Sequence, residues 1–123
     1  ERRLIVFASE GGGYRTNIGC QNADRDATIV SLELFDQQGN SLDLQYMMLF
    51  AWSNDQLNRI FEGHDPVLGS VEVLNTSAGA RYYCYGSVID NLTNDPTTIL
   101  PAALASTSSL TRRPWTSLIT KSK

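Results

Sequence analysis

Apolar and polar residues alternate along most of the chain, in runs about as long as single β-strands. The clearest run covers residues 27–35, where Val30, Leu32 and Leu34 alternate with Ile29 and Ser31. Successive side chains of a strand point to opposite faces of a sheet, so this period of two predicts a strand with one continuous apolar face.

Other segments have the length and composition of strands, and residues typical of turns separate them. We expect further strands near 4–8, 14–21, 41–49, 68–74 and 82–89, with a short one at 97–100 before Pro101. One segment differs. The pattern of a helix start is found at Ser53-Asn54-Asp55-Gln56, where Ser, Asn or Asp can cap the first turn. Apolar residues follow at helical spacing: Leu57, Ile60 and Phe61. This predicts a short helical turn near 54–61 that covers one end of a β core.

Six or seven strands at short spacing, without crossover helices, predict an all-β protein built as an antiparallel sandwich. The 123 residues suffice for one domain. We expect the sandwich to occupy residues 1–104 and a separate tail to occupy 105–123. The chain begins at Glu1 without a methionine, so we expect a processed or excised product whose targeting signal is not visible.

Charge divides the chain into two parts. The net charge is -3, but the tail contains four basic residues and no acidic residue, which leaves -7 on the rest. An acidic body does not favour nucleic acid as a partner, and no apolar run is long enough to span a membrane.

The tail would reach an acidic partner or fold back onto the body. We also expect residues 115–120 to dock as an edge strand, on another copy if 102–109 is a mobile arm, which would give a swapped homo-oligomer.

A polar turn follows the 82–89 strand and offers hard oxygen ligands. Asp90, Asn91, Thr93 and Asp95 would suit a calcium ion. The alternative is that these side chains cap backbone N–H groups. Only two carboxylates are present, and their spacing does not match a known calcium loop.

Arg15 lies early in the 14–21 strand, where a charged side chain needs a partner. We expect a bidentate pair with a carboxylate of this turn, Asp90 or Asp95. The alternative is an Arg15 side chain that is solvated on the open face of the sheet.

The two cysteines, Cys20 and Cys84, are predicted to point inward from different strands. They would form a disulfide bridge between the sheets, closing a loop of 63 residues, for which the chain-entropy estimate is roughly 4 kcal/mol. The alternative is two buried thiols that pack as small apolar groups.

Tyr83 and Tyr85 leave the face that carries Cys84, because neighbouring side chains alternate. If exposed, they would form a flat platform for a sugar ring or a protein partner. The alternative is that they pack beneath the tail or against a neighbouring strand.

His64 is the single histidine and has Asp65 beside it. A Ser-His-Asp site would need a nucleophile elbow, which the sequence lacks. Without a second histidine or clustered cysteines, zinc is not expected either.

Four groups of residues resemble a known type of module in their order and spacing. They are Tyr14-Arg15-Thr16-Asn17 with Asn22, Leu34-Phe35-Asp36 with Gly39, Gln56-Leu57-Asn58 with Ile60-Phe61, and Tyr85-Gly86-Ser87-Val88-Ile89-Asp90-Asn91 with Thr93, Asp95 and Pro96. Over residues 4–102 the chain resembles immunoglobulin-like β-sandwich modules of secreted bacterial proteins, often of unassigned function. The resemblance implies a fold and an export route, and it brings no catalytic residues. Positions 20 and 84 are usually aliphatic or small in such modules, and the tail has no counterpart.

These observations predict a non-catalytic module, extracellular, periplasmic or on the cell surface, that binds a protein or glycan partner or spaces other domains. The alternative is a carbohydrate- or cation-dependent ligand-binding domain, and a small hydrolase is a third reading. No cofactor is expected, and calcium is the one candidate ion.

Overall fold

The computed structural model describes residues 2–64, 68–75 and 79–103, and these form nine β-strands. The strands are β1 (Arg2–Ala8), β2 (Tyr14–Asn22), β3 (Thr28–Phe35), β4 (Ser41–Leu49), β5 (Asn54–Leu57), β6 (Gly69–Asn75), β7 (Tyr82–Asp90), β8 (Pro96–Ile99) and β9 (Ala102–Ala103).

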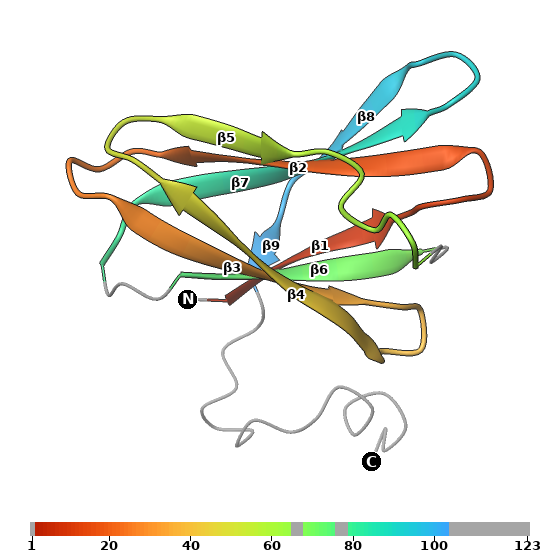
Figure 1. The fold of residues 1–123 in the computed structure, drawn as a ribbon, viewed down its shortest axis with the longest axis horizontal. Helices are drawn as coiled ribbons and strands as arrows, with labels where there is room; N and C mark the ends of the chain where they lie inside the picture. The colour runs from red at the N-terminus through yellow and green to blue at the C-terminus, as the bar shows by residue number, and fades with distance from the viewer. Residues whose placement is uncertain (1, 65–67, 76–78, 104–123) are drawn as a thin grey trace.

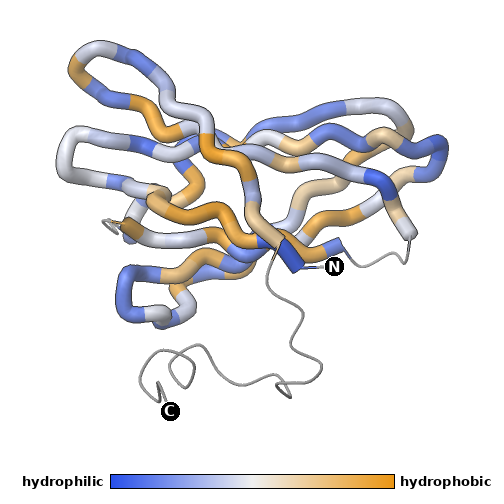
Figure 2. Tube along the Cα trace, turned by 180° about the vertical axis from the view of Figure 1, so that it is seen from behind, coloured by the Kyte–Doolittle hydropathy of each residue, from blue (hydrophilic) through white to orange (hydrophobic). Residues whose placement is uncertain are grey.

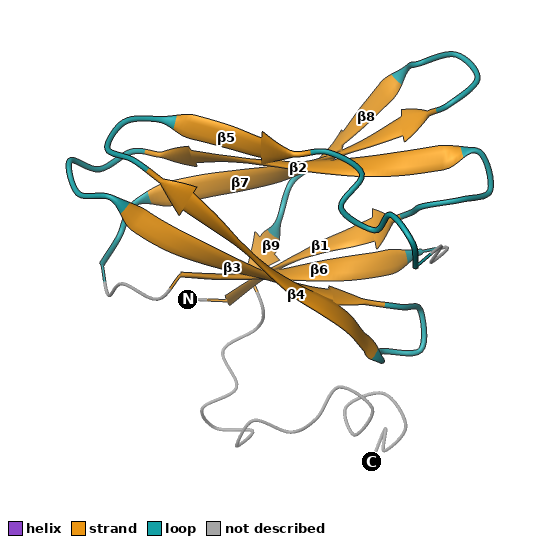
Figure 3. Cartoon of the chain, in the orientation of Figure 1, coloured by secondary structure: helices purple, strands orange, loops and turns teal. Residues whose placement is uncertain are grey.

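The strands form two sheets that face one another (Figure 1). Sheet A has the order β4-β3-β6-β1-β9, and sheet B has the order β5-β2-β7-β8. Each strand pair is antiparallel. The predicted all-β fold with two antiparallel sheets is confirmed, and the described residues contain strands, loops and turns but no helix (Figure 3).

The core lies between the sheets and follows the alternation of the sequence. Val30, Leu32 and Leu34 of β3 are fully buried, as the period of two predicts. They belong to one apolar cluster with Ile5 of β1 and Ile18 of β2, among others. Hydrophilic segments lie in connecting loops and also at the start of β1, next to the N-terminus (Figure 2).

The predicted helical turn near 54–61 is wrong. Residues 54–57 form β5, an edge strand that pairs with β2 and places Leu57 opposite Ile18. Arg59 then has a φ of +49°, which a right-handed helix does not allow. Ile60 and Phe61 are buried as expected, but turns bring them to the core.

The chain changes sheets near its described end. β8 pairs with β7 in sheet B. After Pro101, Ala102 and Ala103 form β9 and pair with β1 in sheet A. The arm expected at 102–109 therefore begins as a strand instead. The rest of that arm, the expected strand at 115–120 and the tail at 105–123 lie outside the described residues. In the part of the chain that is described, no helix has the length and apolarity that a membrane crossing requires.

Candidate functional site

The outer face of sheet B carries two rows of side chains that cross three strands. Gln56 of β5, Gly19 of β2 and Tyr85 of β7 lie opposite one another in register. Asn54, Gln21 and Tyr83 form the next such row. We call these six residues the tyrosine face. It lies beyond the part of β7 that pairs with β8, because that pairing covers only residues 86–89.

Tyr85 lies across Gly19, which has no side chain in its way. A Cβ atom added to Gly19 would come within 2.5 Å of both Cζ and the hydroxyl oxygen of Tyr85. The ring therefore lies along the sheet rather than standing away from it. Its hydroxyl donates a hydrogen bond of 3.3 Å to Gln56 Oε1. The two tyrosines point away from the core, and the side chain of Tyr83 is 49% exposed.

A disulfide lies between the two rows. Cys20 and Cys84 are bonded, with Cα atoms 4.0 Å apart, and both are buried. They are directly opposite in the β2–β7 register, so the bond ties neighbouring strands of sheet B. The expectation that it would bridge the two sheets is wrong. Alternation placed both cysteines correctly on an inward face, but it carries no information about which strands are neighbours.

A shallow depression of about 400 Å³ lies beside Tyr85. Its lining is formed by Cys20, Gln21, Asn54, Asp55, Gln56 and Tyr85. Gln21 lies within this lining: its Oε1 accepts from Asn54 Nδ2 at 3.4 Å, and its Nε2 donates to the backbone oxygens of Trp52, at 3.3 Å, and Asn22, at 3.4 Å. Three amides, a phenol and one carboxylate therefore surround the depression.

The turn after β7 uses its polar side chains to hold the backbone. Asp90 Oδ1 accepts from the backbone N–H groups of Leu92, at 2.8 Å, and Thr93, at 3.4 Å. Thr93 Oγ1 accepts from the N–H of Asp95 at 3.2 Å. These contacts are the capping interactions named as the alternative to calcium binding. Among the described residues, no group of three or more His, Cys, Asp or Glu is placed to hold a metal ion.

Arg15 reaches this turn but contacts amides rather than carboxylates. Its Nη1 donates to Asn91 Oδ1 at 2.6 Å, and its Nη2 donates to Asn94 Oδ1 at 3.4 Å. The expected pair with Asp90 or Asp95 is not formed. The register explains this, because Arg15 lies opposite Ile89, and the Asp90 carboxylate is occupied by backbone N–H groups.

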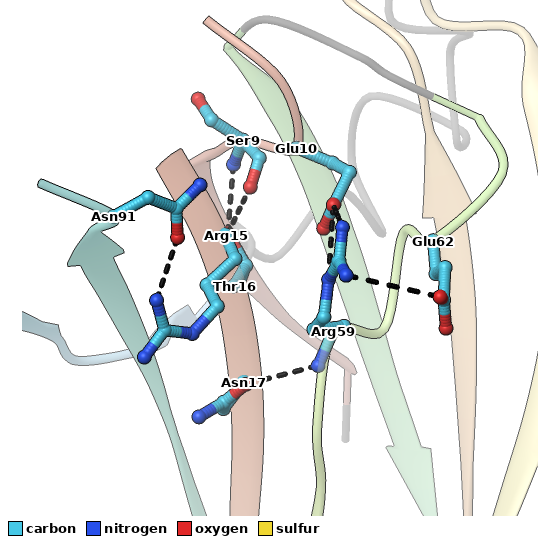
Figure 4. A network of polar contacts seen from close by, with 8 residues as sticks. All are labelled: Ser9, Glu10, Arg15, Thr16, Asn17, Arg59, Glu62 and Asn91. Atoms are coloured by element: carbon cyan, nitrogen blue, oxygen red, sulfur yellow. Dashed lines mark hydrogen bonds and ion pairs between the residues drawn. The ribbon is translucent and has the colours of Figure 1, made fainter. Parts of the chain in front are cut away.

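A second polar cluster, near the Gly-rich loop after β1, was not anticipated from the sequence (Figure 4). Glu10 is only 3% exposed and forms an ion pair with Arg59. The backbone N–H of Arg59 donates to Asn17 Oδ1 at 2.9 Å. Glu10 follows strand-like sequence and precedes three glycines, so the sequence predicts only an acidic residue in a loop. Its partner is 49 residues away, and no local signal reveals it.

This cluster is best explained as a structural tie. It fastens the turns after β5 to β2 and to the loop after β1. Thr16 adds to it, since its Oγ1 accepts from the backbone N–H of Ser9 at 2.8 Å and donates to the Ser9 carbonyl at 2.7 Å. His64 is exposed at the end of the same turns, and its expected neighbour Asp65 lies outside the described residues.

The outer face of sheet A is different in character. Ile29, Tyr46, Met48 and Leu74 are exposed there on neighbouring strands. Tyr46, which is 60% exposed, is thus a surface tyrosine on the other sheet of the molecule.

Comparisons with known proteins inform the fold. No protein-family model matches the sequence, and no curated protein matches it. The structure is similar to the crystal structure of Thermotoga maritima 1070, with a TM-score of 0.65. The match covers 84% of this chain and 93% of that chain at 9% sequence identity. At this identity the likeness shows the architecture alone.

Proposed function

We propose that the protein is a non-catalytic binding module, built as an immunoglobulin-like sandwich, that binds its partner through the tyrosine face. The observation that carries the proposal is the position of Tyr85, laid over Gly19 at the edge of the polar depression. An aromatic ring that lies along a sheet offers a rigid, amphipathic contact surface at low entropic cost.

Two further observations support parts of the proposal. The Cys20–Cys84 disulfide supports a location outside the cytoplasm, because such bonds persist mainly in oxidising compartments. The lining of the depression supports binding rather than catalysis. General acid–base chemistry normally uses placed titratable groups with tuned pKa values, whereas three of the six lining residues are amides and one is a bonded cysteine.

The proposal is tested with a face variant, Tyr83→Ala combined with Tyr85→Ala, and a matched control, Tyr46→Ala. Two probes are used, a panel of soluble oligosaccharides and a phage-displayed library of random peptides. We expect at least one probe to bind the wild type and the control, with affinity for the face variant reduced about tenfold or more. Equal binding to the face variant, or no binding by either probe, would refute the proposal.

A further inference from the structure

We infer that the ligand of the tyrosine face is an uncharged saccharide, with one sugar ring stacked on Tyr85 and its hydroxyl groups bonded to the surrounding amides. The inference rests on the proposed function and adds the chemical class of the ligand. Three properties of the described residues carry it.

The first property is the orientation of the Tyr85 ring. Because one side of the ring lies over Gly19, the opposite side is available to a ligand. The C–H groups on one side of a sugar ring form a flat, weakly apolar surface. Such a surface is complementary to the negative face of an aromatic ring, and stacking removes both from water. Tyr83, two residues away on the same outer face, extends the surface along β7.

The second property is the hydrogen-bonding character of the rim. Each side-chain amide offers both donors and acceptors, as sugar hydroxyls do. Side chains of the rim make four long hydrogen bonds of 3.3–3.4 Å: Tyr85 to Gln56, Asn54 to Gln21, and Gln21 to the carbonyls of Trp52 and Asn22. A fifth, from Gln56 Nε2 to Asn58 Oδ1, has an ordinary length of 2.7 Å. Hydrogen bonds longer than the usual range are weak. Replacing the four long bonds with bonds to sugar hydroxyl groups therefore costs little free energy.

The third property is charge. Among the described residues that line the depression, Asp55 alone is charged. Its Oδ1 accepts a hydrogen bond from the backbone N–H of Gln56 at 2.8 Å, and the remaining acceptor sites of the carboxylate suit hydroxyl groups. The described residues of the lining include no Lys, Arg or His, so a phosphate or an acidic sugar would meet an uncompensated like charge there. Protein hot spots lie in well-packed, fully desolvated pockets, whereas this depression is shallow and its lining is mostly polar. A neutral saccharide is therefore favoured over nucleic acid, acidic glycans and protein.

The disulfide holds the proposed sugar-binding site in a fixed geometry. Cys20 and Cys84 form the rung between the two rows of the tyrosine face, so the strands that carry Gly19 and Tyr85 cannot shift relative to each other. A site held rigid before binding loses less entropy on binding.

The experiment is a calorimetric titration of the full chain with neutral glucose-, xylose- and N-acetylglucosamine-based oligosaccharides, and with an acidic galacturonate oligomer. We expect at least one neutral oligomer to bind, and raised salt to leave its affinity unchanged because no ion pair is involved. Tyr85→Ala should weaken binding about tenfold or more, whereas Tyr85→Phe, which keeps the ring, should change it little. Tyr46→Ala should have no effect.

Gly19→Ala provides a second variant that removes no contact group. Its Cβ would displace the Tyr85 ring, so neutral-sugar binding should fall as it does in Tyr85→Ala while the thermal transition remains cooperative. Preference for the acidic oligomer, or neutral binding that survives both Tyr85→Ala and Gly19→Ala, would overturn the inference. If no sugar binds but peptides bind in a manner that needs Tyr83 and Tyr85, the saccharide class fails and the binding face stands. If neither probe binds, both proposals fail.

Discussion

Two glycines of sheet B have opposite roles at the scale of single residues. A Cβ on Gly19 would meet the far end of the Tyr85 ring on the outer surface. A Cβ on Gly86 would come within 2.8 Å of Ile5 Cγ2, in the core. Ile5 is fully buried and has no room to withdraw, whereas the Tyr85 ring borders solvent and can be displaced outward by an added Cβ.

We therefore expect Gly86→Ala to lower the free energy of unfolding by about 1–3 kcal/mol, the usual range for overpacking a core. Gly19→Ala should lower it by less, because the added Cβ can push the Tyr85 ring outward into solvent without disturbing the core. Urea denaturation of the two variants beside the wild type measures the difference. Equal losses for both variants would show that the Tyr85 ring is held as firmly as the core.

Asp36 provides a residue-level prediction about pH. The backbone N–H of Asn40, which donates to Asp36 Oδ1 at 2.9 Å, is the main cause that lowers the pKa of this carboxyl group. A lowered pKa stabilises the fold above the unfolded pKa of about 3.9, and this contribution disappears as the pH falls through the folded pKa. Asp36→Asn should thus be less stable than the wild type at neutral pH, with the gap closing in acid. Thermal melts across a pH series test this, and a gap independent of pH would contradict it.

At the scale of elements, the antiparallel pair of β2 and β7 carries most of the candidate site. Its nine residue pairs run without a bulge from Tyr14 opposite Asp90 to Asn22 opposite Tyr82. The disulfide, both tyrosines and the Arg15 contact to the turn all lie on this pair. Its rigidity therefore controls both the stability of sheet B and the geometry of the tyrosine face.

Removing the disulfide should be costly for the same reason. The bond joins residues 64 positions apart, and in the chain-entropy model a loop of this size contributes roughly 4 kcal/mol. We expect the double variant Cys20→Ala/Cys84→Ala to unfold with about 2–4 kcal/mol less free energy. The control is the wild type denatured after complete reduction, which should lose a similar amount. An unchanged denaturation midpoint in both samples would argue against the bond.

The elements that follow from local patterns were predictable from the sequence, and those that depend on distant partners were not. Alternation located β3 and the inward direction of both cysteines. The stretch around Leu57 and Ile60 has helical spacing, yet pairing with β2 and the positive φ of Arg59 override it. Tertiary context decides the state of such short segments.

The whole molecule has two outer faces of different chemistry. Sheet B presents tyrosines, amides and a glycine, whereas sheet A exposes Ile29, Met48 and Leu74. Only the outward direction of Tyr83 and Tyr85 could be inferred from the sequence. Their grouping with Gly19 and Gln56 depends on the order of strands β5, β2 and β7, which no local pattern encodes. The difference between the faces gives each binding experiment an internal control on sheet A.

The measurement that tests the central claim most directly is an amide chemical-shift map of the protein titrated with the neutral oligosaccharides. If the tyrosine face is the binding site, the shifts will concentrate on Gly19, Gln21 and Gln56 and on Tyr83 and Tyr85. The amides of Ile29, Tyr46 and Met48 on sheet A will stay in place. Shifts confined to sheet A, or no shifts at any ligand concentration, would contradict the account.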